Sequence, residues 1–230
     1  MRYSMAFLPL VGGIIGLGTY LISGVNPFAE LPVAVRILLT LALSLLITGG
    51  FHVDGFMDTE DAMHSFAPTE KKLEILKDPH IGAFAVIALV KWLLIYAASI
   101  TAILLNERAD ERILVILGLT FVISRSLLGL TSFFFPKAKK EGMLYEETKT
   151  KPRVVVILLS IQLAAAVGVS LWMDLLSGSM VVLLYTLHTI YYRYTVYKNF
   201  GGVTGDTAGY FLTTGEILAA LVLAGTLYLK

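Results

Sequence analysis

Residues 37–43 read Ile-Leu-Leu-Thr-Leu-Ala-Leu and form the centre of an apolar stretch that runs from 31 to 51. A helix needs about 20 apolar residues to cross the hydrocarbon core of a bilayer, and this stretch has that length. A membrane β-strand would alternate apolar and polar side chains over about 10 residues, and residues 37–43 do not alternate. Because backbone polar groups cannot be left unpaired in lipid, the stretch predicts a transmembrane helix.

The composition of the whole chain also indicates a membrane protein. Of the 230 residues, 57% are apolar and only 15% are charged, against roughly 25% charged in a typical soluble domain. A water-soluble enzyme is therefore excluded, since too few polar side chains remain to cover its surface. We expect one all-α integral membrane domain over residues 1–230, a polytopic bundle of about seven transmembrane helices at 4–23, 31–51, 81–105, 112–135, 154–173, 177–192 and 207–229.

Charge and cysteine content exclude several other partners and sites. The net charge of +1 is no basis for expecting DNA or RNA as a partner. The chain has no cysteine, which excludes disulfides, thiolate metal sites, iron–sulfur clusters and cysteine nucleophiles. Arg2 precedes the first apolar stretch and no small-residue cleavage signal follows closely, so we expect a membrane helix there and not a removed signal peptide.

The positive charges predict how the chain is oriented. In a seven-span arrangement, the N-terminus and the segments 52–80, 136–153 and 193–206 share one face of the membrane and carry twelve Lys and Arg residues. The opposite face carries three, which are Arg108, Arg112 and Lys230. Since Lys and Arg concentrate in cytoplasmic segments, we place the N-terminus and the three segments in the cytoplasm.

Acidic residues concentrate just after the second predicted span, where seven of the 17 lie between Asp54 and Asp78. Asp54, Asp58 and Asp61 are spaced i, i+4 and i+7, which places their carboxylates on one face of a helix. Like charges repel in that position, and Mg²⁺ bound through carboxylate oxygens would neutralise them. Acidic groups near membrane depth are costly and usually functional, so we favour a metal site over a solvated acidic helix. We expect His52 to contact phosphate or to orient an Asp.

A glycine-rich segment precedes the last predicted span and reads Gly-Gly-Val-Thr-Gly-Asp at 201–206. Gly201, Gly202 and Gly205 would break the helix and let backbone N–H groups approach a phosphate, although glycine also serves close helix packing in membranes. The orientation count places this segment on the same membrane face as the acidic one. Asp206 is therefore expected to complete the metal cluster.

Three charged side chains, Lys91, Arg125 and Glu216, fall inside predicted spans. Buried charges in lipid require a partner or access to water. Two interpretations stay open at this point. One is a structural pair, for example of Arg125 with Glu216, and the other is a polar cavity that opens to the cytoplasm and binds anions.

Four short blocks of the sequence together form a pattern. The first is a Gly-Gly-x-His-x-Asp-Gly-x-x-Asp-x-x-Asp run at 49–61, and the second is Leu-Glu-Ile-Leu-Lys-Asp followed by Ile-Gly-Ala-Phe at 73–84. The third includes Ser-Arg at 124–125 and Phe-Pro-x-Ala with Glu-Gly at 135–142, and the fourth is Gly-Gly-x-Thr-Gly-Asp-Thr at 201–207. Taken together and in this order, these blocks resemble the cobalamin synthase family, also called adenosylcobinamide-GDP ribazoletransferase.

The resemblance implies an enzyme that joins adenosylcobinamide-GDP to α-ribazole, or to its 5′-phosphate, and releases GMP. This is the final nucleotide-loop step of cobalamin biosynthesis. It implies a multi-pass protein of the bacterial or archaeal inner membrane with Mg²⁺ as cofactor. The partners are then these small molecules and the lipid bilayer, and self-association into a homo-oligomer is left open.

Roles for individual residues follow as hypotheses. We expect the carboxylates to hold Mg²⁺ and take part in catalysis together with His52, and one of them, Asp61, to accept the proton of the attacking ribose hydroxyl. Lys77 and Arg125 are expected to hold phosphate oxygens, beside the backbone of the glycine-rich segment. The predicted metal ligands are Asp54, Asp58, Asp61 and Asp206.

Two other functions fit the sequence less well. A CDP-alcohol phosphotransferase of phospholipid synthesis uses a similar Asp cluster, but its motif has Ala-Arg shortly after Asp-Gly and two later Asp residues four apart. Here Phe56 and Met57 follow Asp54-Gly55. A cation-coupled transporter would place its acidic residues midway through spans, often in broken helices of paired repeats, whereas this cluster lies at a span end and no repeat is present.

Overall fold

The computed structural model describes residues 3–24 and 28–229, and within them the chain forms ten α-helices. They are α1 (Leu8–Gly24), α2 (Val33–Thr48), α3 (Phe51–His64), α4 (Thr69–Ile75), α5 (Ala83–Leu104), α6 (Glu111–Phe134), α7 (Met143–Thr148), α8 (Arg153–Met173), α9 (Leu175–Phe200) and α10 (Gly205–Leu229). Two charges used to predict the orientation, Arg2 and Lys230, lie outside the described residues.

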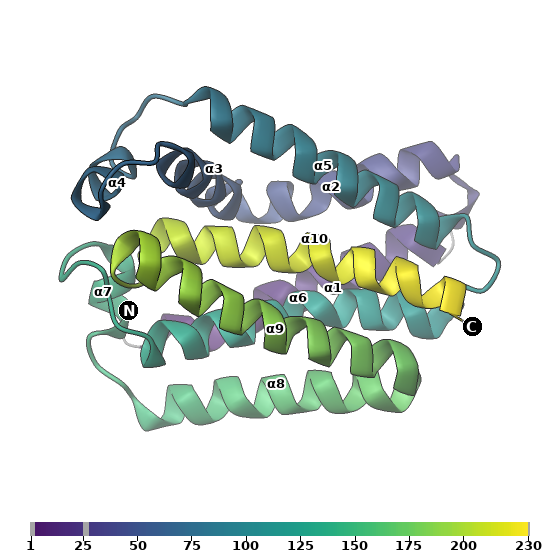
Figure 1. Ribbon diagram of the computed structural model, residues 1–230. Coiled ribbons are helices and arrows are strands. Elements are labelled where there is room, and N and C mark those ends of the chain that lie inside the picture. The colour runs from purple at the N-terminus through teal and green to yellow at the C-terminus, as the bar shows by residue number, and fades with distance from the viewer. Residues whose placement is uncertain (1–2, 25–27, 230) are drawn as a thin grey trace.

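The long helices form one bundle with two distinct ends (Figure 1). Six helices are long and apolar enough to cross a membrane, and α2 and α3 pass the same test together as a bent pair. The predicted all-α polytopic bundle is thus confirmed, with six candidate spans, or seven if the bent pair counts as one. α10 and α6 are the most buried of the spanning helices, whereas α5 and α8 bury little of their surface and face outward.

The second predicted span, 31–51, does not continue straight. α2 ends at Gly49 and α3 begins after Gly50, and both glycines have a positive φ, of 66° and 80°. Such dihedral angles suit glycine because it has no Cβ. The axis of α3 turns by 94° from that of α2, so we treat α3 as lying outside the spanning helices, across one end of the bundle.

The sixth predicted span, 177–192, is longer than hydropathy indicated. α9 continues to Phe200 and ends where Gly201 takes a left-handed conformation with φ 73°. The polar residues after 192 therefore extend the helix, because its end is set by this C-terminal cap and not by the loss of apolar side chains. The predicted loop 193–206 shrinks to four residues.

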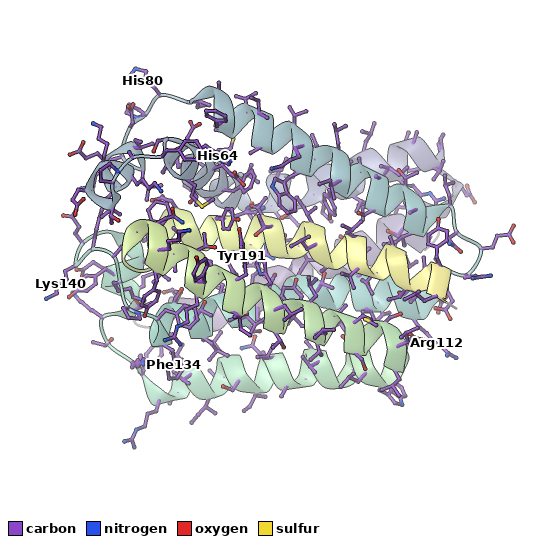
Figure 2. The ribbon with its side chains drawn as sticks, in the orientation of Figure 1. His64, His80, Arg112, Phe134, Lys140 and Tyr191 are labelled. Atoms are coloured by element: carbon purple, nitrogen blue, oxygen red, sulfur yellow. The ribbon has the colours of Figure 1, made fainter. Side chains whose placement is uncertain are left out.

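The two ends of the bundle differ in charge. α3, α4 and α7 cluster at one end, and the C-terminus lies at the other (Figure 1). Lys140 lies at the end that holds α4 and α7, and Arg112 lies at the opposite end (Figure 2). The lysine-rich segments 52–80 and 136–153 thus share one end of the bundle, as the orientation count requires.

Candidate active site

The first element of the site is α3, which forms a helix from Phe51 to His64. Asp54, Asp58 and Asp61 therefore share one face, as their spacing predicted. Asp54 is exposed, and Asp58 and Asp61 are half-buried.

The second element is the start of α10, which crosses α3 at very short range. A Cβ atom on Gly55 would lie 2.8 Å from the Cα of Asp206, and a Cβ on Gly209 would lie 2.5 Å from the carbonyl oxygen of His52. Only glycine permits such an approach of two backbones. The crossing brings Asp206, 145 positions after Asp61 in the sequence, to the carboxylates of α3.

The electrostatics of Asp58 reflect this convergence. Burial raises its pKa to about 6, and the negative charges of Asp54, Asp206 and Asp61 act in the same direction. Like charges disfavour ionisation of a neighbouring carboxyl group. The four carboxylates thus lie close enough for their charges to act on one another, and we call them the carboxylate patch.

The third element is the glycine-rich segment between α9 and α10, which pairs with the loop after α6. Val203 N–H donates to Pro136 O over 2.9 Å, and Ala138 N–H donates to Val203 O over 3.0 Å. A Cβ on Gly202 would lie 2.6 Å from the same Pro136 oxygen. Gly202 therefore allows this pairing, which fixes the lysine-bearing loop beside Asp206.

The start of α10 is capped from within. The N–H of Thr207 donates to Thr204 Oγ1 over 3.1 Å, and the N–H of Thr204 donates to Thr207 Oγ1 over 2.9 Å. This reciprocal capping satisfies the N–H of Thr207 and that of Thr204, which precedes the helix. Gly205, between them, has nothing within 4 Å of an added Cβ and lines an open pocket.

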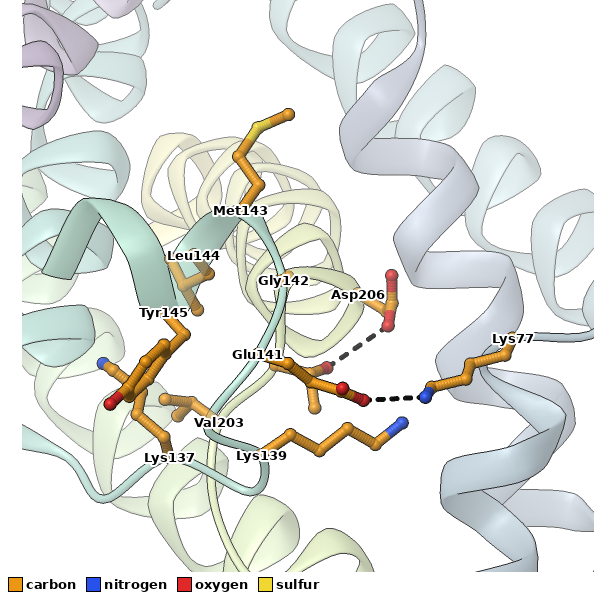
Figure 3. Close-up of a pocket in the computed structure, with 12 residues that line it drawn as sticks. Lys77, Lys137, Lys139, Glu141, Gly142, Met143, Leu144, Tyr145, Val203 and Asp206 are labelled. Atoms are coloured by element: carbon orange, nitrogen blue, oxygen red, sulfur yellow. Dashed lines mark hydrogen bonds and ion pairs between the residues drawn. The ribbon is translucent and has the colours of Figure 1, made fainter. Parts of the chain in front are cut away.

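That pocket has a volume of about 450 Å³ and is lined by Lys77, Lys137, Lys139 and Asp206, together with Glu141 and Tyr145. Lys77 forms an ion pair of 2.8 Å with Glu141, and Figure 3 shows Lys139 extending beside this pair. Asp206 belongs both to the pocket and to the carboxylate patch. The site thus has a basic half and an acidic half that share Asp206.

Burial and neighbouring lysines both act on the lysines of the pocket. Burial lowers the pKa of Lys137 to about 8, and the charge of Lys151 adds to the effect. Burial also lowers the pKa of Lys139, to which the charge of Lys77 contributes. Lys139 Nζ donates to Leu73 O over 2.8 Å, and Lys137 Nζ donates to Ser132 O. Such clustered ammonium groups favour an anion between them.

Sequence reasoning did not select Lys137 or Lys139 as site residues. Both were counted only toward the orientation of the chain, although both lie in the third block of the family pattern, at 135–142. The pairing of that block with the glycine-rich segment is what places them at the pocket.

Two predicted site residues have other partners. His52 is buried at the α2–α3 corner, where its Nδ1 lies 3.1 Å from Thr48 Oγ1 and its Nε2 lies 3.3 Å from Ser44 Oγ. Both ring nitrogens are thus used to hold the corner, and neither is free for phosphate.

Arg125 also lies away from the pocket, deep in α6. Its Nη1 lies 2.5 Å from Glu216 Oε1, to which Ser124 Oγ also donates over 3.1 Å. Arg125 is only 2% exposed. Of the two interpretations left open, the structure shows the structural pair for Arg125 and Glu216. Arg125 therefore belongs to the interior of the bundle and not to the predicted substrate site.

Some of the remaining predicted site residues line the pocket and others lie outside it. Lys77, Gly205 and Asp206 line the pocket, whereas Gly201 caps α9 and Gly202 packs against the loop after α6. Asp61 accepts two backbone hydrogen bonds from the start of α5, one on each oxygen.

The carboxylates fit Mg²⁺ by their chemistry, since hard oxygen ligands are the ones this ion prefers. Burial, and after it the charges of the neighbouring carboxylates, raise the pKa of Asp58, and a bound cation would oppose both effects. In residues 3–24 and 28–229, no group of three or more His, Asp or Glu side chains converges closely enough to enclose an ion in this arrangement. The side chains of Asp54, Asp58 and Asp206 would have to turn toward one another to bind one.

Comparison with known proteins now identifies the family. The family model described as cobalamin-5-phosphate synthase matches residues 1–224. A relative from Lachnoclostridium phytofermentans, named adenosylcobinamide-GDP ribazoletransferase, is 35% identical over 96% of this chain and 83% of its own length. Relatives of the same name from Clostridium perfringens and Listeria monocytogenes are 33% and 32% identical, over 96% and 97% of this chain and 87% of their own length. No solved structure matches the chain. The chain belongs to the cobalamin-5-phosphate synthase family.

Proposed function

We propose that this protein joins adenosylcobinamide-GDP to α-ribazole, or to its 5′-phosphate, in the last assembly step of cobalamin. A ribose hydroxyl of α-ribazole attacks the phosphorus next to cobinamide, the bond from that phosphorus to the oxygen bridging the two phosphates breaks, and GMP and one proton are released. The observation that carries the proposal is the pocket lined by three lysines together with Asp206, in a chain that matches the family model over 224 residues.

The basic half of the pocket suits the diphosphate. Attack on a diphosphate is slow unless its negative charge is offset and its atoms are aligned with the nucleophile. Lys77, Lys137 and Lys139 all line one cavity. The volume of about 450 Å³ lies in the range of small-molecule sites. The lysines would hold the phosphate oxygens of the GDP portion there.

The start of α10 adds a second source of positive potential. N–H groups in the first turn of a helix and its dipole favour anions. Gly205 leaves this end open toward the pocket, because it has no side chain to cover the backbone. The N-terminus of α10 would therefore orient a phosphate against the lysines.

The acidic half is where we place the metal. Asp54 and Asp58 of α3 and Asp206 of α10 would hold Mg²⁺. When bound, the ion supplies positive charge to the diphosphate and to the leaving GMP. The close crossing of α3 and α10 at Gly55 and Gly209 positions these carboxylates beside the lysines, so that both halves of the site act on the same phosphates.

We also propose that this end of the bundle faces the cytoplasm and that the protein lies in the inner membrane of a bacterium or archaeon. The lysine-rich segments 52–80 and 136–153 lie at the end that holds the pocket, and positive side chains concentrate on the cytoplasmic face. Nucleotide substrates would then reach the site without crossing the bilayer.

The test is Mg²⁺-dependent release of GMP from adenosylcobinamide-GDP by the purified protein. We expect Asp58→Asn to lower turnover at least about 100-fold while the protein stays inserted and folded. Glu70→Gln is the matched control, because Glu70 is an exposed carboxylate of α4 that lies outside the four sequence blocks and does not line the pocket. Near-normal GMP release by Asp58→Asn would contradict the proposed site. Absence of GMP release by the wild-type protein, with cation flux into vesicles, would contradict the proposed function.

A further inference from the structure

We infer that Asp61 is a positioning residue that holds the start of α5 and the Lys77 segment against α3, and not a ligand of the metal. Its two oxygens have separate backbone donors. Gly82 N–H donates to Asp61 Oδ2 over 2.5 Å, and Ala85 N–H donates to Asp61 Oδ1 over 2.8 Å. Both oxygens are therefore engaged on the side of α3 that faces α5.

The start of α5 needs such a partner. The first N–H groups of a helix have no acceptor within the helix. The N-cap residue of α5 is Gly82, which has no side chain to accept from them, and no side-chain cap of its own is present. A carboxylate at this position satisfies two donors and places a negative charge at the positive end of the helix dipole. Asp61 thus caps α5 from a different helix.

The space at Gly82 is shaped for this contact. A Cβ atom added to Gly82 would lie 2.2 Å from Asp61 Oδ2 and 2.5 Å from its Cγ. Any other residue at 82 would push the carboxylate away. The glycine of the Ile-Gly-Ala-Phe block and the last aspartate of the Gly-Gly-x-His-x-Asp run therefore form one structural unit.

This contact has a consequence for the pocket. Residues 76–82 connect α4 to α5 and carry Lys77, whose ammonium group lines the pocket. Asp61 fixes the far end of that connection at Gly82 and lies one helical turn from Asp58. Its loss would release the Lys77 segment while leaving Asp54, Asp58 and Asp206 in place.

The experiment measures three properties of the full-length protein in nanodiscs. In Asp61→Asn, one oxygen is replaced by an amide that cannot accept, so we expect amide hydrogen exchange at residues 82–88 to rise by about tenfold or more. The affinity for Mn²⁺ alone, measured by electron paramagnetic resonance, should stay close to the wild-type value. Asp58→Asn should show the reverse, with unchanged exchange at 82–88 and an affinity for Mn²⁺ that is lower by about tenfold or more.

Kinetics separate positioning from general stability. The KM for adenosylcobinamide-GDP should rise about tenfold in Asp61→Asn and in Lys77→Ala, and the two effects should not add in the double variant, because both remove the same contact with the phosphates. Gly82→Ala should reproduce the exchange and KM changes of Asp61→Asn. If Asp61→Asn fails to fold, Asp61→Ser, which keeps one acceptor, takes its place.

Two results would overturn the inference. One is loss of Mn²⁺ affinity in Asp61→Asn equal to that in Asp58→Asn, with exchange at 82–88 unchanged. The other is a KM that stays at the wild-type value in the folded variant, which would leave only a stabilising role. The kinetic arm rests on the proposed function, but the exchange and Mn²⁺ arms do not. A wild-type protein that releases no GMP would therefore contradict the function and leave the role of Asp61 to be decided by those two arms.

Discussion

Replacing Gly209 by alanine should separate α3 from α10 by a distance that the structure defines. The new Cβ would lie 2.5 Å from the carbonyl oxygen of His52, whereas carbon–oxygen contacts are found at about 3.3 Å or longer. The two helices must therefore move apart by about 0.8 Å. That movement carries the carboxylates of α3 away from Asp206, which lies on the other helix.

The expected effect follows from that displacement. A misplacement of about 1 Å between catalytic groups can cost about 100-fold in rate, so we expect the kcat for GMP release to fall by roughly 10–100-fold. Overpacking at such a contact costs about 1–3 kcal/mol of stability, so the melting temperature should fall as well. Both are measured on protein purified in the same detergent.

Gly225→Ala is the matched control. Gly225 lies on the same helix, and an added Cβ there meets nothing within 4 Å. Alanine is the better helix former by about 0.5–1 kcal/mol, so this variant should keep its kcat and melt no lower than the wild type. A Gly209→Ala protein with the kcat and melting temperature of Gly225→Ala would refute the reasoning that the α3–α10 spacing sets the geometry of the site.

Three further outcomes are expected. The pKa of Asp58 is raised from 3.8 to about 6 in the fold, so the metal-free protein binds this proton more tightly than the unfolded chain does. Thermal stability after chelation should therefore increase as the pH falls from 7 through 6 toward 4, an increase that Asp58→Asn should lack, while affinity for Mn²⁺ should fall over the same range. Lys139→Ala should lower kcat/KM for adenosylcobinamide-GDP by about 10–100-fold. Added salt should not restore this value, because salt screens charges and does not replace the lost ammonium group. Arg125→Ala leaves the carboxylate of Glu216 buried and unpaired and should cost about 3–5 kcal/mol of stability, seen in the melting temperature, while Arg125→Met combined with Glu216→Gln should recover most of it.

The spacing of the aspartates was enough to predict the helix that carries them. A period of 3.6 residues places Asp54, Asp58 and Asp61 on one face whatever the surroundings, and α3 has that face. The different role of each aspartate could not be predicted in the same way. That Asp61 points to α5 depends on the position of Gly82, which is set by the packing of three helices.

Helix ends and charge partners were harder to predict, for different reasons. Hydropathy ended a span at residue 192 because polar and tyrosine side chains follow, but a helix can extend beyond the lipid and α9 ends at its glycine cap. A charge inside a span requires a partner, and Glu216 was one candidate for Arg125. Choosing the ion pair over an open cavity required the distance between α6 and α10.

The crossing of α3 with α10 also determines when the site can form during synthesis. α3 is complete by residue 64, and its partner in the crossing begins only at residue 205. Until α10 is inserted, the aspartates of α3 lack Asp206 and the glycine-rich segment, and the lysines after α6 lack the strand-like pairing that fixes them. The acidic and basic halves of the site therefore stay separate until the last helix of the chain is made. We expect affinity for metal and nucleotide to arise with the insertion of this helix, after the rest of the bundle has been made.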